Sequence, residues 1–230
     1  MDRPYVICHM LMSIDGKVTG EFLFRDECVS ATDIYYEINR EYRADAYACG
    51  RITMQGSFTG DYFPDLSNYG NRFDKQDHVA EYDKKFFAVA FDPHARLGWK
   101  ASVINDFDPG YGGAHIIEVL TENIDTRYTC YLRDIGISYI FAGKESIDVS
   151  LALGKLRELF GIEKLLLEGG SILNGAFASA GLVDEISLVV APMVAATGDK
   201  PLFMNSLVAD YTLSDCHTYE GGILHTKYKR

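Results

Sequence analysis

Met12–Val18 (MSIDGKV) places polar side chains directly after an apolar run. Ser13, Asp15 and Gly16 form a polar turn at the point where a buried strand is expected to leave its sheet. In open α/β sheets, ligands bind at the carboxyl ends of the strands, so this turn is a candidate ligand contact. The alternative is an ordinary Asp-Gly turn that binds nothing.

Cys49–Gly56 (CGRITMQG) has the residue types of a phosphate site. Gly50 allows a close backbone approach, and the residues after it are expected to begin a short helix whose free N–H groups would face an anion. Arg51 adds a cation and Thr53 adds a hydroxyl donor. The alternative is a surface arginine beside a threonine that caps the helix.

Leu165–Gly175 (LLLEGGSILNG) runs from a buried strand through Glu168 and Gly169-Gly170 into a helix. Two glycines let backbone amides approach a diphosphate, and the helix dipole points at it. The glycines could instead serve only tight packing between strand and helix. Two turns suited to phosphate binding in one sheet suggest a dinucleotide ligand, although neither turn alone is specific for one.

The motifs of several other function classes are absent. The sequence has no GxGxxG, no GxxxxGK followed by Ser or Thr, no GxSxG, no HExxH, and no HxE with PCxxC. Its six histidines do not pair at metal-ligand spacing, so no metal site is expected. The net charge of −11 disfavours nucleic acid as a partner. No stretch approaches 18 uncharged apolar residues, so no membrane span is expected.

Cysteine usage and the N-terminus both favour a cytoplasmic protein. The five cysteines are odd in number, widely scattered and form no CxxC, which predicts reduced thiols rather than a disulfide framework. The first residues (MDRPYVICHM) lack the basic and apolar regions of a secretory signal.

Apolar runs and helical periodicities alternate along the chain, which predicts an α/β domain. Strands are expected at residues 5–12, 45–50, 84–91, 114–120, 137–143, 162–170, 184–194, 209–220 and 223–229, and helices at 30–43, 125–136, 148–161 and 171–181. Ser30 and Thr32 are candidate caps of the first helix. The last two strands should form a hairpin across Gly221-Gly222. We expect one domain over residues 1–230, with an irregular insertion at 57–85 that is either a functional loop or poorly ordered.

Taken together, these segments resemble the reductase domain of bifunctional riboflavin-biosynthesis deaminase–reductases. The resembling stretches are RPYVICHMLMSIDGKV, ADAYACGRIT, AVAFDPHARL and LLLEGGSILNGAFASAGLVDEISLVVAPMV, in family order from Arg3 to about Val194. The resemblance implies a dihydrofolate-reductase-like fold with three αβα layers. Its central sheet would be mostly parallel and would end in a C-terminal antiparallel hairpin.

The resemblance also implies NADPH binding and hydride transfer. It places Ser13, Asp15 and Gly16 near the nicotinamide and substrate, with Glu168 on the substrate side. The positions it assigns to the cofactor phosphates are Gly50, Arg51 and Thr53, and those assigned to the diphosphate are Gly169, Gly170, Ser171 and Ile172.

The chain departs from the family at two places. His9 stands where these reductases usually carry a lysine; it either binds substrate or donates a proton, as Asp15 and Glu168 could, or is a satisfied interior histidine. An acidic DDP- or DNP-like element usually follows the threonine of the second motif, but here the stretch is MQGSFTGDYFPD. Those positions bind the phosphoribosyl substrate in the family, so we expect another small heterocyclic or sugar-derived substrate.

Two residues point to different cofactors. Arg51 favours the 2′-phosphate of NADPH, and Arg96 is a second possible phosphate partner. Asp92, at the end of the third strand, could instead accept a ribose 2′-OH and favour NADH, by analogy with other dinucleotide folds. The resemblance tips the prediction toward NADPH.

The sequence therefore predicts a cytoplasmic, NADPH-dependent reductase that positions the nicotinamide against its substrate. Three alternatives remain open: 5-amino-6-(5-phosphoribosylamino)uracil reductase, dihydrofolate reductase, and a non-catalytic dinucleotide-binding module. The C-terminal strands are apolar enough to cover a partner, so a homodimer is expected, as the resemblance also implies.

Overall fold

The structure, a computed structural model, describes residues 2–70 and 75–230, and its chain divides into two units. Unit 1 comprises the residues up to Pro4 and Ala44–Leu165; unit 2 comprises Tyr5–Arg43 and Leu166–Arg230. One strand, β6 (Lys164–Leu167), has two residues in each unit. The single domain predicted from the sequence stays a prediction.

Unit 1 is built on four parallel strands in the order β5-β4-β3-β2. The strands are β2 (Ala46–Gly50), β3 (Phe87–Phe91), β4 (His115–Leu120) and β5 (Ser138–Phe141). All residues of β3, β4 and β5 are buried, as expected for parallel strands covered on both faces.

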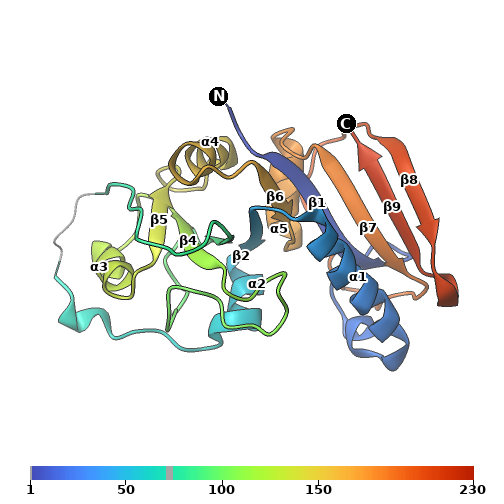
Figure 1. The fold of residues 1–230 in the computed structure, drawn as a ribbon, viewed down its shortest axis with the longest axis horizontal. Coiled ribbons are helices and arrows are strands. Elements are labelled where there is room, and N and C mark those ends of the chain that lie inside the picture. Colours follow the sequence, from blue (N-terminus) through green and yellow to red (C-terminus); the bar gives the residue numbers. More distant parts are fainter. Residues whose placement is uncertain (1, 71–74) are drawn as a thin grey trace. The chain divides into compact units, whose positions relative to one another are not determined.

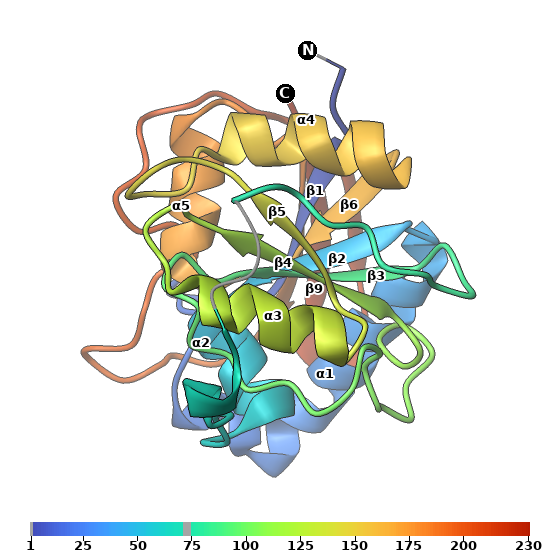
Figure 2. The same cartoon turned by 90° about the vertical axis from the view of Figure 1, so that its left-hand side faces the viewer.

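Helices α3 (Thr126–Asp134) and α4 (Val149–Phe160) cover opposite faces of this sheet (Figure 2). The chain passes from β4 through α3 to β5, the outermost strand, and then from β5 through α4 in the opposite direction along the sheet. Because both crossovers are right-handed, α3 and α4 lie on opposite faces. Asp125 and Asp148 cap the two helices by accepting backbone N–H bonds, and Gly161 ends α4 at a φ of 69°. The short helix α2 (Arg51–Met54) continues as one π-helical turn, Gln55–Thr59.

The described part of the predicted insertion at 57–85 includes a short 3-10 turn at Leu66–Asn68, and residues 71–74 lie outside the described residues. Its second half covers the free edge of β5: His78 and Tyr139 exchange backbone bonds of 2.8 and 2.9 Å. Asp77 accepts the Phe141 amide at 2.8 Å and pairs with Lys155 at 2.7 Å. This segment therefore satisfies backbone groups that an open sheet edge would expose.

Unit 2 joins β1 (Tyr5–Ser13) in parallel to β7 (Glu185–Ala191), after which the strand order continues through β9 (Leu224–Lys229) to β8 (Thr212–Thr218) with antiparallel pairing. Gly221 and Gly222 make the turn between β8 and β9 at φ of 76° and 79°, a region that side chains disfavour. The helices of this unit are α1 (Val29–Tyr42) and α5 (Ser171–Ser179).

Helix α1 packs across β1 and β7 (Figure 1). Ala31 and Ile38 on its inner face meet Val189 and Ala191 of β7, and all four side chains are at most 3% exposed. The helix begins at Val29, and neither Ser30 nor Thr32 caps it; the Thr32 hydroxyl bonds back to the Cys28 carbonyl instead. The cap predicted for this helix is therefore wrong.

The predicted fold class is confirmed: the protein is α/β, with mostly parallel strands and a C-terminal antiparallel hairpin. All predicted helices and strands are present, with ends that differ by a few residues. The five cysteines are free thiols. Within residues 2–70 and 75–230, no helix has the length and apolar character needed to cross a membrane.

Candidate functional site

The turn that follows β1 is held by its own polar side chains. Buried Ser13 donates its hydroxyl to Asp15 Oδ1 at 2.6 Å and accepts the Lys17 amide at 3.0 Å. The hydrogen bond from Ser13, followed by one from the Ala195 amide, lowers the pKa of Asp15. Asp15 is therefore ionised at neutral pH, which suits an acceptor better than a proton donor. Gly16 sits in the turn at a φ of 78°.

Residues 193–204 tie this turn to the start of α5. The Ile14 amide donates to the Met193 carbonyl at 2.9 Å, and the Leu202 amide donates to the Gly16 carbonyl at 3.1 Å. Farther along, the Met204 amide donates to the Ser171 carbonyl at 3.0 Å. A Cβ on Gly175 would lie 1.8 Å from the Met204 carbonyl oxygen, so glycine is required for this approach. The sequence analysis did not anticipate this segment.

The start of α5 carries a glycine pair and two buried polar side chains. Gly169 adopts a φ of 98°, and the Gly169–Gly170 peptide bond is cis. Ser171 Oγ and Asn174 Oδ1 are buried and have no hydrogen-bond partner among the described residues. The hydroxyl can donate to a phosphate oxygen and the amide oxygen can accept from a hydroxyl, so this pair fits such a ligand. The Ile172 side chain is apolar and 64% exposed, so only the backbone amide of this residue could bind a phosphate.

Glu168 precedes the glycine pair and is 7% exposed. Its Oε1 accepts a hydrogen bond of 2.6 Å from Nδ2 of Asn39, a residue of α1 that is 4% exposed. Burial, and then the nearby Glu168 charge, raise the pKa of the Cys8 thiol, which stays neutral. A largely buried carboxylate at a strand end is suited to bind polar groups of a small ligand.

His9 lies inside unit 2, at 0% exposure, with both ring nitrogens engaged. Nε2 bonds the Tyr35 carbonyl at 3.0 Å and Nδ1 bonds Ser187 Oγ at 3.1 Å. The ring also stacks on Tyr35, with centroids 4.4 Å apart. Burial lowers the pKa of His9 to about 4. These surroundings favour the interior role weighed above, and a catalytic role for His9 stays a prediction.

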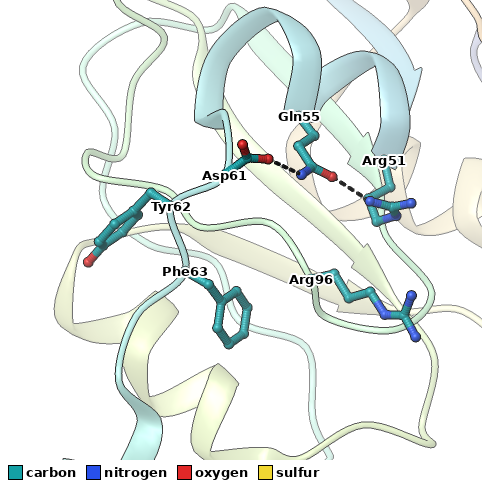
Figure 3. Close-up of a pocket in the computed structure, with 6 residues that line it drawn as sticks. All are labelled: Arg51, Gln55, Asp61, Tyr62, Phe63 and Arg96. Carbon is teal, nitrogen blue, oxygen red and sulfur yellow. Dashed lines mark hydrogen bonds between the residues drawn. The ribbon is translucent and has the colours of Figure 1, made fainter.

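In unit 1, Gly50 is extended and directly precedes α2, as predicted. Arg51 and Arg96 line a cleft of about 320 Å³ together with Gln55, Asp61, Tyr62 and Phe63. Arg51 donates to Gln55, which in turn donates to Asp61 at 3.5 Å (Figure 3). Thr53 lies in the same short helix and is half-buried.

The first half of the insertion forms the wall of this cleft. Figure 3 shows Tyr62 and Phe63 on one side and the two arginines on the other. Phe63 stacks in parallel on Tyr128 with centroids 6.1 Å apart. A Cβ on Gly98 would lie 1.9 Å from the Tyr62 carbonyl oxygen, so glycine allows the two loops to meet. The wall is thus anchored, and it combines two cations with two aromatic rings.

Asp92 holds the loop that carries Arg96. It is fully buried, and its carboxylate accepts the backbone amides of Arg96 and Leu97, the latter at 2.8 Å. Desolvation raises its pKa despite these bonds. A carboxylate so enclosed is not positioned to reach a ribose, so the environment favours a structural role over the predicted 2′-OH contact.

Each unit therefore groups some of the predicted residues. Unit 2 contains the β1 turn, Glu168 and the glycine pair, whereas unit 1 contains the two arginines of the cleft. The sequence analysis missed Asn39, Asn174, Gln55, Asp61, Tyr62 and Phe63. A buried asparagine in an apolar helix face is the one signal that could have revealed Asn39.

Comparisons with known proteins identify relatives of this chain. A 2,5-diamino-6-ribosylamino-4(3H)-pyrimidinone 5′-phosphate reductase of Methanothermobacter thermautotrophicus is 32% identical over 197 residues, which cover 84% of this chain and 79% of that protein. The enzyme of the same name from Aquifex aeolicus is 29% identical over 203 residues, covering 84% of this chain and 79% of its own.

Solved structures show the same fold. A pyrimidine reductase-like protein from Corynebacterium diphtheriae matches with a TM-score of 0.66 at 18% identity, over 98% of this chain and 91% of its own. RibD from Acinetobacter baumannii matches with a TM-score of 0.67 at 18% identity, over 99% of this chain and 58% of its own. The profile of the RibD C-terminal domain matches residues 4–224. The chain therefore belongs to the RibD C-terminal domain family and is a member of a family of reductases.

Proposed function

We propose that this protein reduces 2,5-diamino-6-ribosylamino-4(3H)-pyrimidinone 5′-phosphate with NADPH. The observation that carries the proposal is the 32% identity to a reductase of that name over 84% of the chain. The buried carboxylate of Glu168 beside the Gly169-Gly170 turn supports it from the structure. This substrate carries a phosphoribosyl group, which the missing acidic element argued against in the sequence analysis; the identity to the named reductase outweighs that argument.

The reaction requires two electrons and two hydrogens at the sugar. A ribosylamino group opens to an imine, and reduction delivers a hydride to its carbon and a proton to its nitrogen. NADPH, when bound, would supply the hydride. The protein must then bind the pyrimidine, align the sugar carbon and exclude water.

The residues divide by the chemistry they can offer. The amides at Gly170, Ser171 and Ile172, with the Ser171 hydroxyl, would bind the diphosphate. Glu168 would accept hydrogen bonds from the amino groups of the pyrimidine. Ser13, Asp15 and Gly16 would shape the nicotinamide side of the site, Asp15 as an ionised acceptor. We keep a substrate or proton-donor role for His9 as an untested alternative.

Arg51 and Arg96 would bind the 2′-phosphate of NADPH, together with the donors of Gly50 and Thr53. A dianionic phosphate suits two guanidinium groups in one cleft, and Tyr62 or Phe63 offers a face for the adenine. Asp92 supports the loop of Arg96, so it contributes indirectly to this preference for NADPH over NADH.

Turnover tests the function directly. Purified protein is incubated with NADPH and the ribosylaminopyrimidine phosphate, and mass spectrometry follows the gain of two hydrogen atoms by this substrate. Dihydrofolate and 5-amino-6-(5-phosphoribosylamino)uracil are run in parallel. Preferred turnover of either parallel substrate would replace the proposal with that alternative, and NADPH binding without any turnover would favour the non-catalytic module.

Arg96→Ala should weaken NADPH selectively. Loss of a charge-assisted hydrogen bond to the 2′-phosphate is expected to raise the KM for NADPH roughly 10- to 100-fold. The KM for NADH, which lacks that phosphate, should change little. Arg127→Ala is the matched control, because the Arg127 side chain is 42% exposed and pairs with its neighbour Asp125. An equal loss for both cofactors would rule out 2′-phosphate recognition by Arg96.

We also propose that a second copy of the chain packs on β8 and β9. No residue of β8 is buried, and Leu213 and Leu224 are 54% and 36% exposed. Leu213→Asp is expected to convert a dimer to a monomer in analytical ultracentrifugation. Leu207→Asp, at a leucine outside these strands that is 70% exposed, should leave the dimer intact. A monomeric wild-type protein would refute this interface.

A further inference from the structure

We propose that Asn39 is a positioning residue for Glu168: its side-chain amide holds the carboxylate in the ionised, oriented form that binds the pyrimidine. This inference rests on the function proposed above. Nδ2 of Asn39 donates to Oε1 of Glu168 at 2.6 Å, and the two side chains are 4% and 7% exposed. The bond joins residues 129 positions apart in the sequence.

If Asn39 served only the folding of α1, its amide would lower the stability of the protein at this position. It lies in α1 directly after Ile38, which is buried against β7 with Ala31. Asparagine is a poor helix former, and burying an amide carries a desolvation cost that only hydrogen bonding offsets. A leucine there would extend the apolar face at lower cost, so the amide is better explained by its bond to the carboxylate.

The bond has two chemical consequences for Glu168. A donated N–H favours the charged form of a carboxylate over the protonated form. It also engages one carboxylate oxygen, Oε1, and so limits rotation of the carboxylate. A pyrimidine amino group therefore meets an acceptor that needs no reorientation on binding.

Asn39→Leu removes the donor and keeps the number and branching of the side-chain heavy atoms. We expect kcat/KM for the pyrimidine to fall roughly 10- to 100-fold, with the KM for NADPH unchanged. The acidic limb of the pH profile of kcat/KM should move up by about one pH unit, because the carboxylate loses a bond to its charged form. In a Glu168→Gln background, the same substitution should add little further loss, since the carboxylate charge that the bond orients has been removed.

Ile38→Ala is the control for a general structural effect. It should lower stability through lost packing on the same helix but leave the acidic limb of the pH profile in place. Equal pH profiles for wild type and Asn39→Leu, or full additivity with Glu168→Gln, would overturn the inference.

A second measurement separates this inference from the proposed function. Infrared difference spectra of the protein without substrate report the Glu168 carboxylate stretch, which Glu168→Gln identifies. The band should shift in Asn39→Leu. A shifted band without turnover of the pyrimidine by the wild type would refute the proposed function alone. An unshifted band would refute the role of Asn39 whatever the substrate.

Discussion

Glu168→Gln should reduce kcat/KM for the ribosylaminopyrimidine phosphate by roughly 100- to 1000-fold, while NADPH binding persists. Glutamine keeps the volume and can still accept the bond from Asn39, but it removes the charge at a site only 7% exposed. An amide presents one acceptor oxygen where the carboxylate presents two, and its NH₂ group would oppose the amino groups of the substrate. A hydrogen bond to a charged group is worth about 1.5 to 3 kcal/mol, and a substrate donor left unsatisfied in a buried site adds to the loss.

The measurement is steady-state kinetics with separate titration of NADPH by nicotinamide fluorescence. Gly170→Asp is the contrasting variant, since a carboxylate at the start of α5 should repel the diphosphate and abolish cofactor binding. The two variants therefore lose activity for separable reasons. Activity of Glu168→Gln within threefold of wild type would mean that Glu168 does not contact the substrate.

Local signals in the sequence predicted the elements well. Strand β3 reads as a continuous apolar run and is buried throughout, and Gly161 ends α4 with a left-handed φ. The hairpin glycines, Gly221 and Gly222, both take positive φ as their spacing suggested. In each of these cases the information lies within a few adjacent residues, which is why one sequence is sufficient.

The environments of the titratable residues were not predictable in the same way. His9 was a candidate because it stands where the resembling reductases carry a lysine, and Asp92 because it directly follows a strand. The structure encloses His9 between Tyr35 and Ser187, and it surrounds Asp92 with amides of its own loop. Those partners lie on another helix, another strand or an irregular loop, so no local pattern reveals them.

Asn39 and the aromatic wall of the cleft show the same limit. Asn39 reaches Glu168 only because α1 packs beside the strand end, a contact between residues far apart in sequence. Tyr62 and Phe63 belong to a segment without periodicity, and their placement depends on the missing side chain of Gly98. Irregular segments are positioned by such individual contacts, whereas helices and strands follow from repeating patterns.

The buried histidines should make the protein sensitive to acid, and the contribution of His9 can be attributed to specific contacts. Tyr35 offers His9 Nε2 only a carbonyl oxygen, so Nε2 carries the proton and Nδ1 accepts from Ser187. Ser187 Oγ in turn accepts from His225 Nε2, at 2.9 Å. A second proton on His9 would break this chain and place a cation in the interior near His225 and Lys227.

Burial accordingly lowers the pKa of His9 from 6.5 to about 4. The unfolded chain therefore binds a proton that the folded chain excludes between those two values. The contribution of neutral His9 to the free energy of unfolding is fully present above pH 6.5 and is lost as the pH falls toward 4. The shift corresponds to about 3 kcal/mol, a large part of the stability of a typical domain.

Other titratable residues also change how the stability depends on pH. Burial also lowers the pKa values of His115 and His225 to about 4, which acts in the same direction. Burial raises the pKa values of Glu118 and Asp92, which opposes it, because the folded state then holds a proton that the unfolded state releases. The contribution of His9 is therefore isolated best by comparing a variant with the wild type at each pH.

His9→Gln keeps an N–H donor for the Tyr35 carbonyl but cannot be protonated. Urea unfolding at several pH values between 7 and 4 should show that the variant loses about 3 kcal/mol less than the wild type over this range. His217→Gln is the control, since that side chain is 62% exposed on β8 and should leave the pH dependence as it is. Parallel stability curves for wild type and His9→Gln would mean that His9 is protonated inside the folded protein, which would restore its candidacy as a proton donor.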